Sequence, residues 1–141
     1  MILLDTTILS YAISGEHHLQ SPCQRLLEAH EEGRITAATT PEVIQEFVHV
    51  RSRRHGRTEA ADLGRQFAEA LTLIATTPQD LELGLDLFER CPNLGAFDAA
   101  LAAVAISGRA KALVSADRAF GEVYRLHWVD PATQALAELL Q

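Results

Sequence analysis

The chain of 141 residues has only two cysteines, Cys23 and Cys91, and their spacing fits neither a zinc site nor a disulfide framework. Both are expected to be small buried side chains with free thiols, as is usual in a reducing compartment. The longest strictly apolar run, Ala99 to Ile106, has eight residues, whereas roughly 20 are needed to span a bilayer. Because only three apolar residues separate Met1 from the first acid, we expect no signal peptide, no membrane contact and a cytoplasmic location.

Positive charge is scarce as well. Twelve Lys and Arg residues stand against 19 Asp and Glu residues, which gives a formal net charge of −7. This balance excludes a protein that coats nucleic acid through bulk positive charge, but not a nuclease, whose site must itself be acidic to hold metal. The sequence also lacks repeats and linkers, and its 48% hydrophobic content argues against disorder. We therefore expect one domain that covers residues 1–141.

Short apolar segments alternate with amphipathic segments along the chain. The predicted strands are Met1–Leu4, Ile35–Ala38, Thr72–Ala75, Lys111–Ser115 and Leu126–Val129. The predicted helices are Thr6–Ser14, Pro22–Glu32, Pro41–Arg54, Thr58–Leu71, Pro78–Arg90, Ala96–Ser107 and Pro131–Leu140. Strands that alternate with helices predict an α/β fold, a three-layer α/β/α sandwich with a mainly parallel sheet of four to five strands.

Four of these helices are predicted to begin where a hydroxyl or acid precedes a proline, which is a strong signal for a helix N-terminus. The four pairs are Ser21-Pro22, Thr40-Pro41, Thr77-Pro78 and Asp130-Pro131. In the helix that follows Thr77, Leu81, Leu85 and Phe88 share one side. The acids of that helix are expected to form a solvated face: Asp80, Glu82, Asp86 and Glu89.

Two of the predicted strands run directly into a hydroxyl and an acid. Asp5 follows the first strand, and Asp117 follows the strand that ends at Ser115. Ligands of open α/β sheets bind outside the carboxyl ends of parallel strands, so we expect both acids at the same edge. Glu46 lies at the border of an apolar helical stripe, and Asp98 lies in the first turn of an otherwise apolar helix.

We predict that these four acids converge and hold divalent ions. Carboxylate oxygens suit the hard cations Mg²⁺ and Mn²⁺, and a cation offsets the repulsion between neighbouring carboxylates. Two such ions can activate a water and stabilise the leaving oxygen of a phosphodiester. The hydroxyls of Thr6, Thr7 and Ser115 adjoin the acids and are expected to orient them or a metal-bound water.

Simpler interpretations of the same acids remain open. Asp5 and Asp117 could cap the helices that follow them. Asp98 could be stabilised in the first turn by the dipole of its helix, and Glu46 could be an ordinary surface residue. The acids would then be structural or vestigial in a non-catalytic α/β binding module. A third hypothesis, an aspartyl-phosphate protein, is weaker because Asp5 has no second acid two residues later and the only lysine, Lys111, precedes its strand.

Four of the twelve basic residues fall within one seven-residue stretch: Arg51, Arg53, Arg54 and Arg57. They begin about one helical turn beyond Glu46 on the same predicted helix. Arginine suits bidentate contact with phosphate, so the stretch is a candidate for binding a nucleic-acid backbone. A solvated helix C-terminus that complements the dipole is an equally good interpretation.

The histidines are not assigned to the reaction. His17 and His18 are adjacent in a polar loop, where they are expected to be solvated, because neighbouring histidines cannot easily share one metal from a helix face. His49 and His55 lie in or near the basic stretch and could act as acid or base. We prefer a metal-activated water for that role.

Taken in order, these motifs resemble the PIN-domain ribonucleases, specifically the VapC-type toxins of bacterial and archaeal toxin–antitoxin pairs. The resemblance is carried by Leu4-Asp5-Thr6-Thr7-Ile8-Leu9, Val43-Ile44-Gln45-Glu46-Phe47, Phe97-Asp98-Ala99-Ala100-Leu101-Ala102 and Ser115-Ala116-Asp117-Arg118-Ala119-Phe120. Their order and spacing match the family over essentially the whole chain. Thr7 stands where the family usually has Asn or Ser, and Ala119 stands where many relatives carry a further acid.

The resemblance implies a Rossmann-like fold and a single PIN domain over residues 1–141. It implies a Mg²⁺- or Mn²⁺-dependent endoribonuclease that cleaves RNA with an activated water, as the toxin of a type II toxin–antitoxin system. It also implies a VapB-like antitoxin that blocks the site, and a toxin homodimer. The family's four acidic positions match Asp5, Glu46, Asp98 and Asp117.

Overall fold

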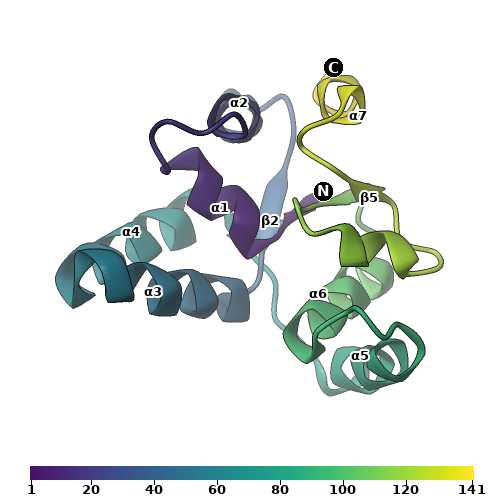
Figure 1. Cartoon of the computed structure of the whole chain (residues 1–141). Coiled ribbons are helices and arrows are strands. Elements are labelled where there is room, and N and C mark those ends of the chain that lie inside the picture. Colours follow the sequence, from purple (N-terminus) through teal and green to yellow (C-terminus); the bar gives the residue numbers. More distant parts are fainter.

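The computed structural model describes all residues from 1 to 141, and its centre is a five-stranded parallel sheet (Figure 1). The strands are β1 (Ile2–Leu4), β2 (Ala37–Thr39), β3 (Thr72–Leu73), β4 (Ala112–Val114) and β5 (Trp128–Val129). Their order across the sheet is β3-β2-β1-β4-β5, and every pairing is parallel. The carboxyl ends of β1 and β4 therefore lie side by side in the middle of the sheet.

Helices cover both faces of the sheet. They are α1 (Thr6–Ala12), α2 (Gln20–Glu31), α3 (Pro41–His55), α4 (Arg57–Ala70), α5 (Pro78–Arg90), α6 (Ala96–Ser107) and α7 (Gln134–Leu139), with a 3₁₀ turn η1 at Arg118–Glu122. In Figure 1, α1, α2 and α7 lie on one side and α5 and α6 on the other. None of these helices combines the length and apolarity that crossing a membrane requires. The predicted three-layer α/β/α sandwich is confirmed.

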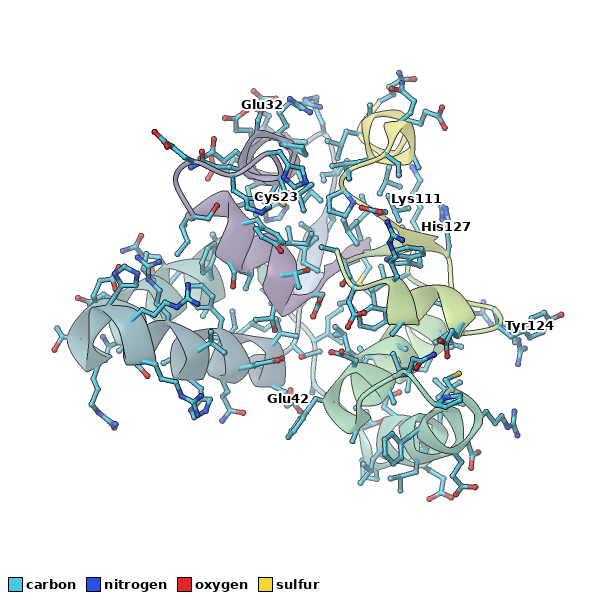
Figure 2. All side chains as sticks on the ribbon, in the orientation of Figure 1. Cys23, Glu32, Glu42, Lys111, Tyr124 and His127 are labelled. Carbon is cyan, nitrogen blue, oxygen red and sulfur yellow. The ribbon has the colours of Figure 1, made fainter.

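The two cysteines are buried and unpaired, as predicted. Cys23 lies on the inner side of α2 (Figure 2), and its side chain has no exposed surface. Burial raises the pKa of the Cys23 thiol to about 12, because an ionised thiolate would lose its hydration there. Both residues contribute to the hydrophobic core as small apolar side chains.

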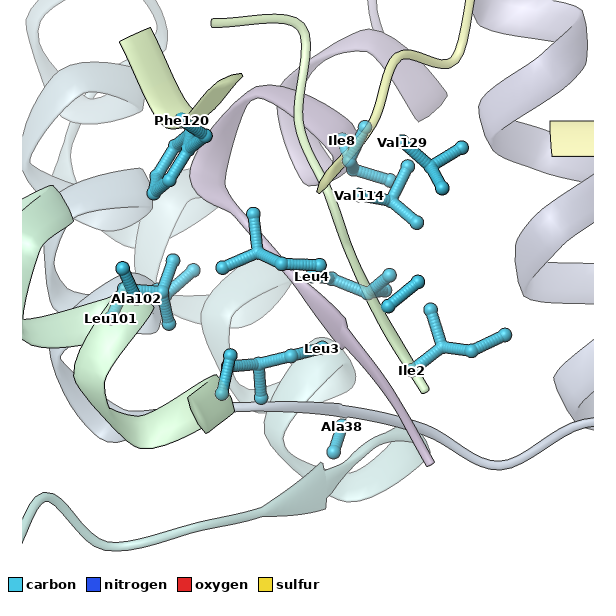
Figure 3. Packing of buried hydrophobic residues seen from close by; sticks show 14 of the residues in the cluster. Ile2, Leu3, Leu4, Ile8, Ala38, Leu101, Ala102, Val114, Phe120 and Val129 are labelled. Atoms are coloured by element: carbon cyan, nitrogen blue, oxygen red, sulfur yellow. The ribbon is translucent and has the colours of Figure 1, made fainter. Parts of the chain in front are cut away.

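The central strands are buried on both faces, which explains why their sequences show no polar alternation. Leu3 of β1 points toward Leu101 and Ala102 of α6, whereas Val114 of β4 lies with Ile8 on the opposite side (Figure 3). Leu3, Ile8 and Val114 have no exposed surface. Each such side chain contributes about 1.5–3 kcal/mol to folding through burial, so the edge that carries the acids is firmly held.

Two of the four predicted helix starts are confirmed. The Thr40 hydroxyl accepts a hydrogen bond from the Val43 amide at 3.3 Å and begins α3. The Thr77 hydroxyl accepts one from the Asp80 amide at 3.1 Å, while the Asp80 carboxylate accepts from the Thr77 amide at 2.9 Å. This reciprocal pair is a capping box and fixes the start of α5.

The other two predicted starts are wrong by two to three residues. Helix α2 begins two residues earlier, after Leu19, so that Ser21 and Pro22 lie inside its first turn. Helix α7 begins only after Thr133, because Asp130 and the residues that follow it form a turn. A proline anywhere in the first turn removes no intrahelical hydrogen bond, and Asp before Pro also initiates turns. Such pairs therefore do not fix the first helical residue.

The exposed and buried sides of α5 also differ from expectation. Asp80 is only 5% exposed and accepts a hydrogen bond from the Ser107 hydroxyl at the end of α6. Leu81, Leu85 and Phe88 are 47–53% exposed. The reason is that α5 packs against α6 through Gly84: a Cβ atom there would lie 3.0 Å from the Ala100 Cα. Leu81, Leu85 and Phe88 are consequently left at the surface, whereas Leu87 is buried.

Candidate functional site

Asp5 lies at the junction of β1 and α1, where only 3% of its surface is exposed. One carboxylate oxygen accepts a hydrogen bond from the Thr6 amide at 2.7 Å. The other accepts from the Ser115 hydroxyl at 2.6 Å and from the Thr7 hydroxyl at 3.1 Å. Burial raises the pKa of Asp5 more than these three hydrogen bonds lower it, and the charge of Glu46 adds to the rise. Asp5 is thus fixed in position but resists ionisation.

The hydroxyls of Ser115 and Thr7 join the end of β4 to the start of α1. Ser115 is fully buried, and its hydroxyl also accepts from the Asp117 amide at 3.0 Å. The Thr7 hydroxyl accepts from the Ala116 amide at 3.0 Å. The Trp128 indole N–H donates to the Ser115 carbonyl at 2.9 Å and anchors the same segment from β5. Sequence reasoning gave no role to Trp128, because this contact depends on the packing of β5.

Glu46 lies on the exposed surface of α3. The Thr6 hydroxyl donates to its carboxylate at 2.9 Å, which ties α3 to the first residue of α1. Val43 and Phe47, its neighbours along the helix, are buried. Glu46 therefore lies at the border of the apolar stripe, where the sequence pattern puts it, and points its carboxylate at the β1–α1 junction.

Asp98 is half-buried in the first turn of α6. Burial, followed by the negative charges of Asp5, Glu46 and Asp117, raises its pKa to about 7. Asp98 is therefore within electrostatic reach of the other three carboxylates, although the four come from separate segments. Asp117 is exposed and caps η1 by accepting from the Ala119 amide at 2.9 Å, so the capping role considered for it also holds.

The donors gathered here are carboxylate and hydroxyl oxygens, the ligand set that Mg²⁺ and Mn²⁺ prefer. No three Asp, Glu, His or Cys side chains are arranged so that they could hold a metal ion as they stand. A metal ion would bind Asp98 in its deprotonated form, as it does other carboxylate ligands.

A groove with a volume of about 540 Å³ opens beside the acids. Its acidic lining includes Glu46, Asp98 and Glu42, the last of which is labelled at the start of α3 in Figure 2. Its apolar lining comes from α3, α5 and α6: Val43, Leu81, Leu85, Phe88, Phe97 and Leu101. Sequence reasoning missed this groove, although Phe97, which is 80% exposed beside an acid, is an indication of it.

The predicted phosphate-contacting arginines lie at the far end of the α3–α4 hairpin, away from the carboxyl end of β1 (Figure 1). Arg51 forms a two-point ion pair with Glu59 of α4, at 2.6 and 3.2 Å, and Arg53 contacts the His49 ring at 3.0 Å. Arg54 and Arg57 are exposed and form no ion pair. The structure therefore does not bring this stretch into the acidic cluster.

A known class of protein domain shares this strand order and this arrangement of acids, two after central strands and two on helices. The profile of the PIN domain matches residues 2–126, a range that contains all four acids. The chain therefore belongs to the PIN-domain family.

Within this class, the chain is similar to the VapC ribonucleases. It is 48% identical to Ribonuclease VapC7 of Mycobacterium tuberculosis, over 99% of this chain and 98% of that protein. It is 31% identical to Ribonuclease VapC23 of the same organism, over 70% of this chain and 78% of that protein. The chain is thus a VapC-type member of the family, and the resemblance inferred from its motifs is confirmed.

Solved structures of VapC proteins share the fold. Mycobacterium tuberculosis VapC20, described as a sarcin-ricin loop cleaving toxin, matches with a TM-score of 0.71 and 15% identity, over 86% of this chain and 93% of that one. VapBC2 from Rickettsia felis, bound to a promoter DNA fragment, matches with a TM-score of 0.73 and 23% identity, over 92% and 98%. VapBC-1 from nontypeable Haemophilus influenzae matches with a TM-score of 0.72 and 15% identity, over 94% and 100%.

Proposed function

We propose that this protein is a metal-dependent endoribonuclease that acts in the cytoplasm as the toxin of a toxin–antitoxin pair. The observation that carries the proposal is the meeting of four carboxylates at one edge of the sheet, with Asp98 shifted to a pKa of about 7 by burial and by the other three. A protein 48% identical to the chain is named a ribonuclease, which supports RNA as the substrate.

Asp5, Asp98 and Asp117 would hold Mg²⁺ or Mn²⁺, with Glu46 at the border of the site. A bound ion supplies an activated water and stabilises charge on the phosphodiester oxygens. The chain's own groups prepare for it: Ser115 and Thr7 fix one oxygen of Asp5, and Thr6 orients the Glu46 carboxylate. With a pKa of about 7, Asp98 is only partly ionised at neutral pH, which lowers the charge of the cluster, and its proton would leave when a cation binds.

A VapB-like antitoxin is the partner that we propose, and its support comes from fold relatives solved as VapBC complexes. The apolar groove beside Glu46 and Asp98 suits a segment with apolar side chains and an arginine, because a guanidinium pairs strongly with carboxylates. We also propose a toxin homodimer, which sedimentation of the purified protein tests directly.

The alternative of a non-catalytic binding module keeps one observation in its favour, which is that no three acids are arranged to hold an ion. In that case the acids would serve as caps, as Asp5 and Asp117 already do. Calorimetric titration with Mn²⁺ separates the two functions, since the module predicts no saturable binding.

The decisive experiment compares the wild type with Asp98→Asn and with Asp86→Asn, a change of an exposed acid on α5. Cellular RNA is incubated with each protein and Mn²⁺, and the cut ends are sequenced. We expect wild type and Asp86→Asn to cut at the same sites, and Asp98→Asn to be slower by at least about 100-fold, because one carboxylate that would hold the ion is lost and with it much of the electrostatic stabilisation of the reaction. Equal cleavage by Asp98→Asn, or full activity in excess chelator, would refute the proposal.

A further inference from the structure

Three aromatic rings are stacked at the surface between α1 and α2. Tyr11 of α1 stacks on His17, with ring centroids 4.3 Å apart and planes 20° from parallel. His17 stacks in turn on His18, with centroids 4.5 Å apart and planes 27° from parallel. We call these three residues the aromatic stack.

The aromatic stack is anchored at one end and open at the other. Tyr11 is half-buried and packs against the hydrophobic core. The middle ring is held by a hydrogen bond that the Leu19 amide donates to Nδ1 of His17 at 3.1 Å, and Leu19 is itself buried. His18 is exposed, and its side chain makes no hydrogen bond in the structure. A ring that is already oriented can accept another flat group without a large loss of entropy.

Helix α1 connects the aromatic stack to the acidic cluster. The helix begins directly after Asp5 and runs outward to the α1–α2 loop (Figure 1). Tyr11 lies four residues after Thr7, and so on the same side of the helix as the hydroxyl that contacts Asp5. Six residues from Asp5 to Tyr11 correspond to about 9 Å along the helix axis, a distance that a strand of a few nucleotides can cover.

The negative net charge of the protein favours a contact with nucleic acid that does not depend on Lys or Arg side chains. The net charge is −7, and several arginines are already paired: Arg34 with Glu32, Arg51 with Glu59 and Arg65 with Asp62. The net charge therefore opposes, on average, the approach of a phosphate backbone. Stacking of bases on aromatic rings provides affinity for single strands without net positive charge.

We propose that the aromatic stack is a platform on which the protein binds a base of single-stranded RNA, with the open face of His18 taking the base. The nucleotide concerned flanks the one that is cut at the acidic cluster. This inference rests on the proposed function in two respects: the ligand is RNA, and the RNA is cut at the acidic cluster.

The test measures binding of a fluorescent single-stranded octaadenylate at pH 8 to full-length Asp98→Asn protein, which should cut the probe far more slowly than the wild type. Adding His18→Ala is expected to weaken binding about tenfold, within the range measured for loss of one stacked base. Adding His18→Phe keeps a ring and should restore the affinity. Tyr124→Ala is the matched control, because Tyr124 is 85% exposed on the far side of the molecule from the α1–α2 loop (Figure 2).

Salt dependence distinguishes stacking from phosphate contact. The slope of log affinity against log salt should be unchanged by His18→Ala, whereas loss of a phosphate-contacting arginine reduces it by about 0.7 for a single strand. A duplex RNA of equal length should bind equally well with and without His18→Ala, since its bases are already stacked.

The platform is overturned if His18→Ala binds the probe as tightly as its parent, or if the parent binds no probe. It is also overturned if His18→Ala lowers only the melting temperature or only the affinity for a protein partner. The two proposals can fail separately. If the wild type cleaves RNA but probe binding does not need His18, the platform alone is refuted. If the wild type cleaves no RNA but probe binding still needs His18, the nuclease and the position beside the cut nucleotide are refuted, and the base platform stands.

Discussion

Asp98 lies at the start of α6, where burial, followed by the charges of Asp5, Glu46 and Asp117, raises its pKa from 3.8 to about 7. Between these two values the folded protein binds a proton that the unfolded chain does not bind. The stabilising effect of that proton is full at acid pH and is lost as the pH rises toward 7. Above pH 7 the ionised carboxylate destabilises the fold unless a cation is present.

We therefore expect Asp98→Asn to stabilise the ion-free protein at pH 8, because the amide removes a charge from a crowded site. The melting temperature in excess chelator should rise by about 3 °C, which corresponds to roughly 1 kcal/mol for a chain of this size. At pH 5 the difference should nearly vanish, since Asp98 is then protonated in the wild type. Calorimetric scans at both pH values check this, and an equal shift at pH 5 and pH 8 would contradict it.

At the scale of single residues, the sequence predicted which acids meet but not how firmly each is held. Asp5 and Asp117 could be found because each directly follows an apolar strand, and adjacent parallel strands end at one edge. Asp80 could not be assigned correctly, since its partner Ser107 lies 27 residues away on another helix. A helical acid with a distant partner has the same local pattern as a solvated one.

At the scale of elements, the pair α5 and α6 determines where Asp98 lies. Gly84 allows the two helices to approach, because a Cβ atom at this position would lie 3.0 Å from the Ala100 Cα and 3.2 Å from the Ala100 nitrogen. Both are backbone atoms and cannot rotate away. The apolar pattern of α5 therefore did not reveal which side is buried: a glycine and a small residue fit together there, while Leu81 and Leu85 remain exposed.

We expect Gly84→Ala to lower the free energy of unfolding by about 1–2 kcal/mol, because overpacking outweighs the gain of about 1 kcal/mol in helix propensity. The displacement of α6 should also reduce RNA cleavage about tenfold or more, since small misplacements of reacting groups are costly. Urea denaturation and cleavage rates measure both effects. Gly95→Ala, where a Cβ atom would meet nothing within 4 Å, is the control, and an equal loss in that variant would contradict the explanation.

The start signals of elements were reliable where the hydroxyl itself formed the cap, as at Thr40 and Thr77. They failed at Ser21 and Asp130, where the chain before or after the proline decides the boundary. Strand limits shifted for a similar reason. Strand β2 begins at Ala37 rather than Ile35, because its limits depend on pairing with β1 and not on composition alone.

At the scale of the whole molecule, acidic groups dominate, with 19 acids against 12 bases. A cation that binds the folded protein alone stabilises it in proportion to the logarithm of its concentration. We expect Mn²⁺ at about 100 times its dissociation constant to add about 2.7 kcal/mol to the stability of the wild type, which raises the melting temperature by several degrees. Asp5→Asn should lose most of this rise, and an equal rise in that variant would show that the ions bind elsewhere.

Two features depend on the tertiary structure: the groove beside the acids, and the position of the arginines at the far end of the α3–α4 hairpin. The groove combines residues of α3, α5 and α6, three segments whose meeting no local pattern reveals. For the same reason, the arginines after Glu46 looked close to the acids along the sequence, yet one of them is neutralised by Glu59 of the next helix.

The sheet ends on each side in a strand of only two residues, β3 and β5. Such short borders expose few unpaired amide and carbonyl groups, so they give a neighbouring chain little to extend. Copies released from any binding partner and concentrated in a small volume should consequently remain dispersed instead of joining border to border into fibrils.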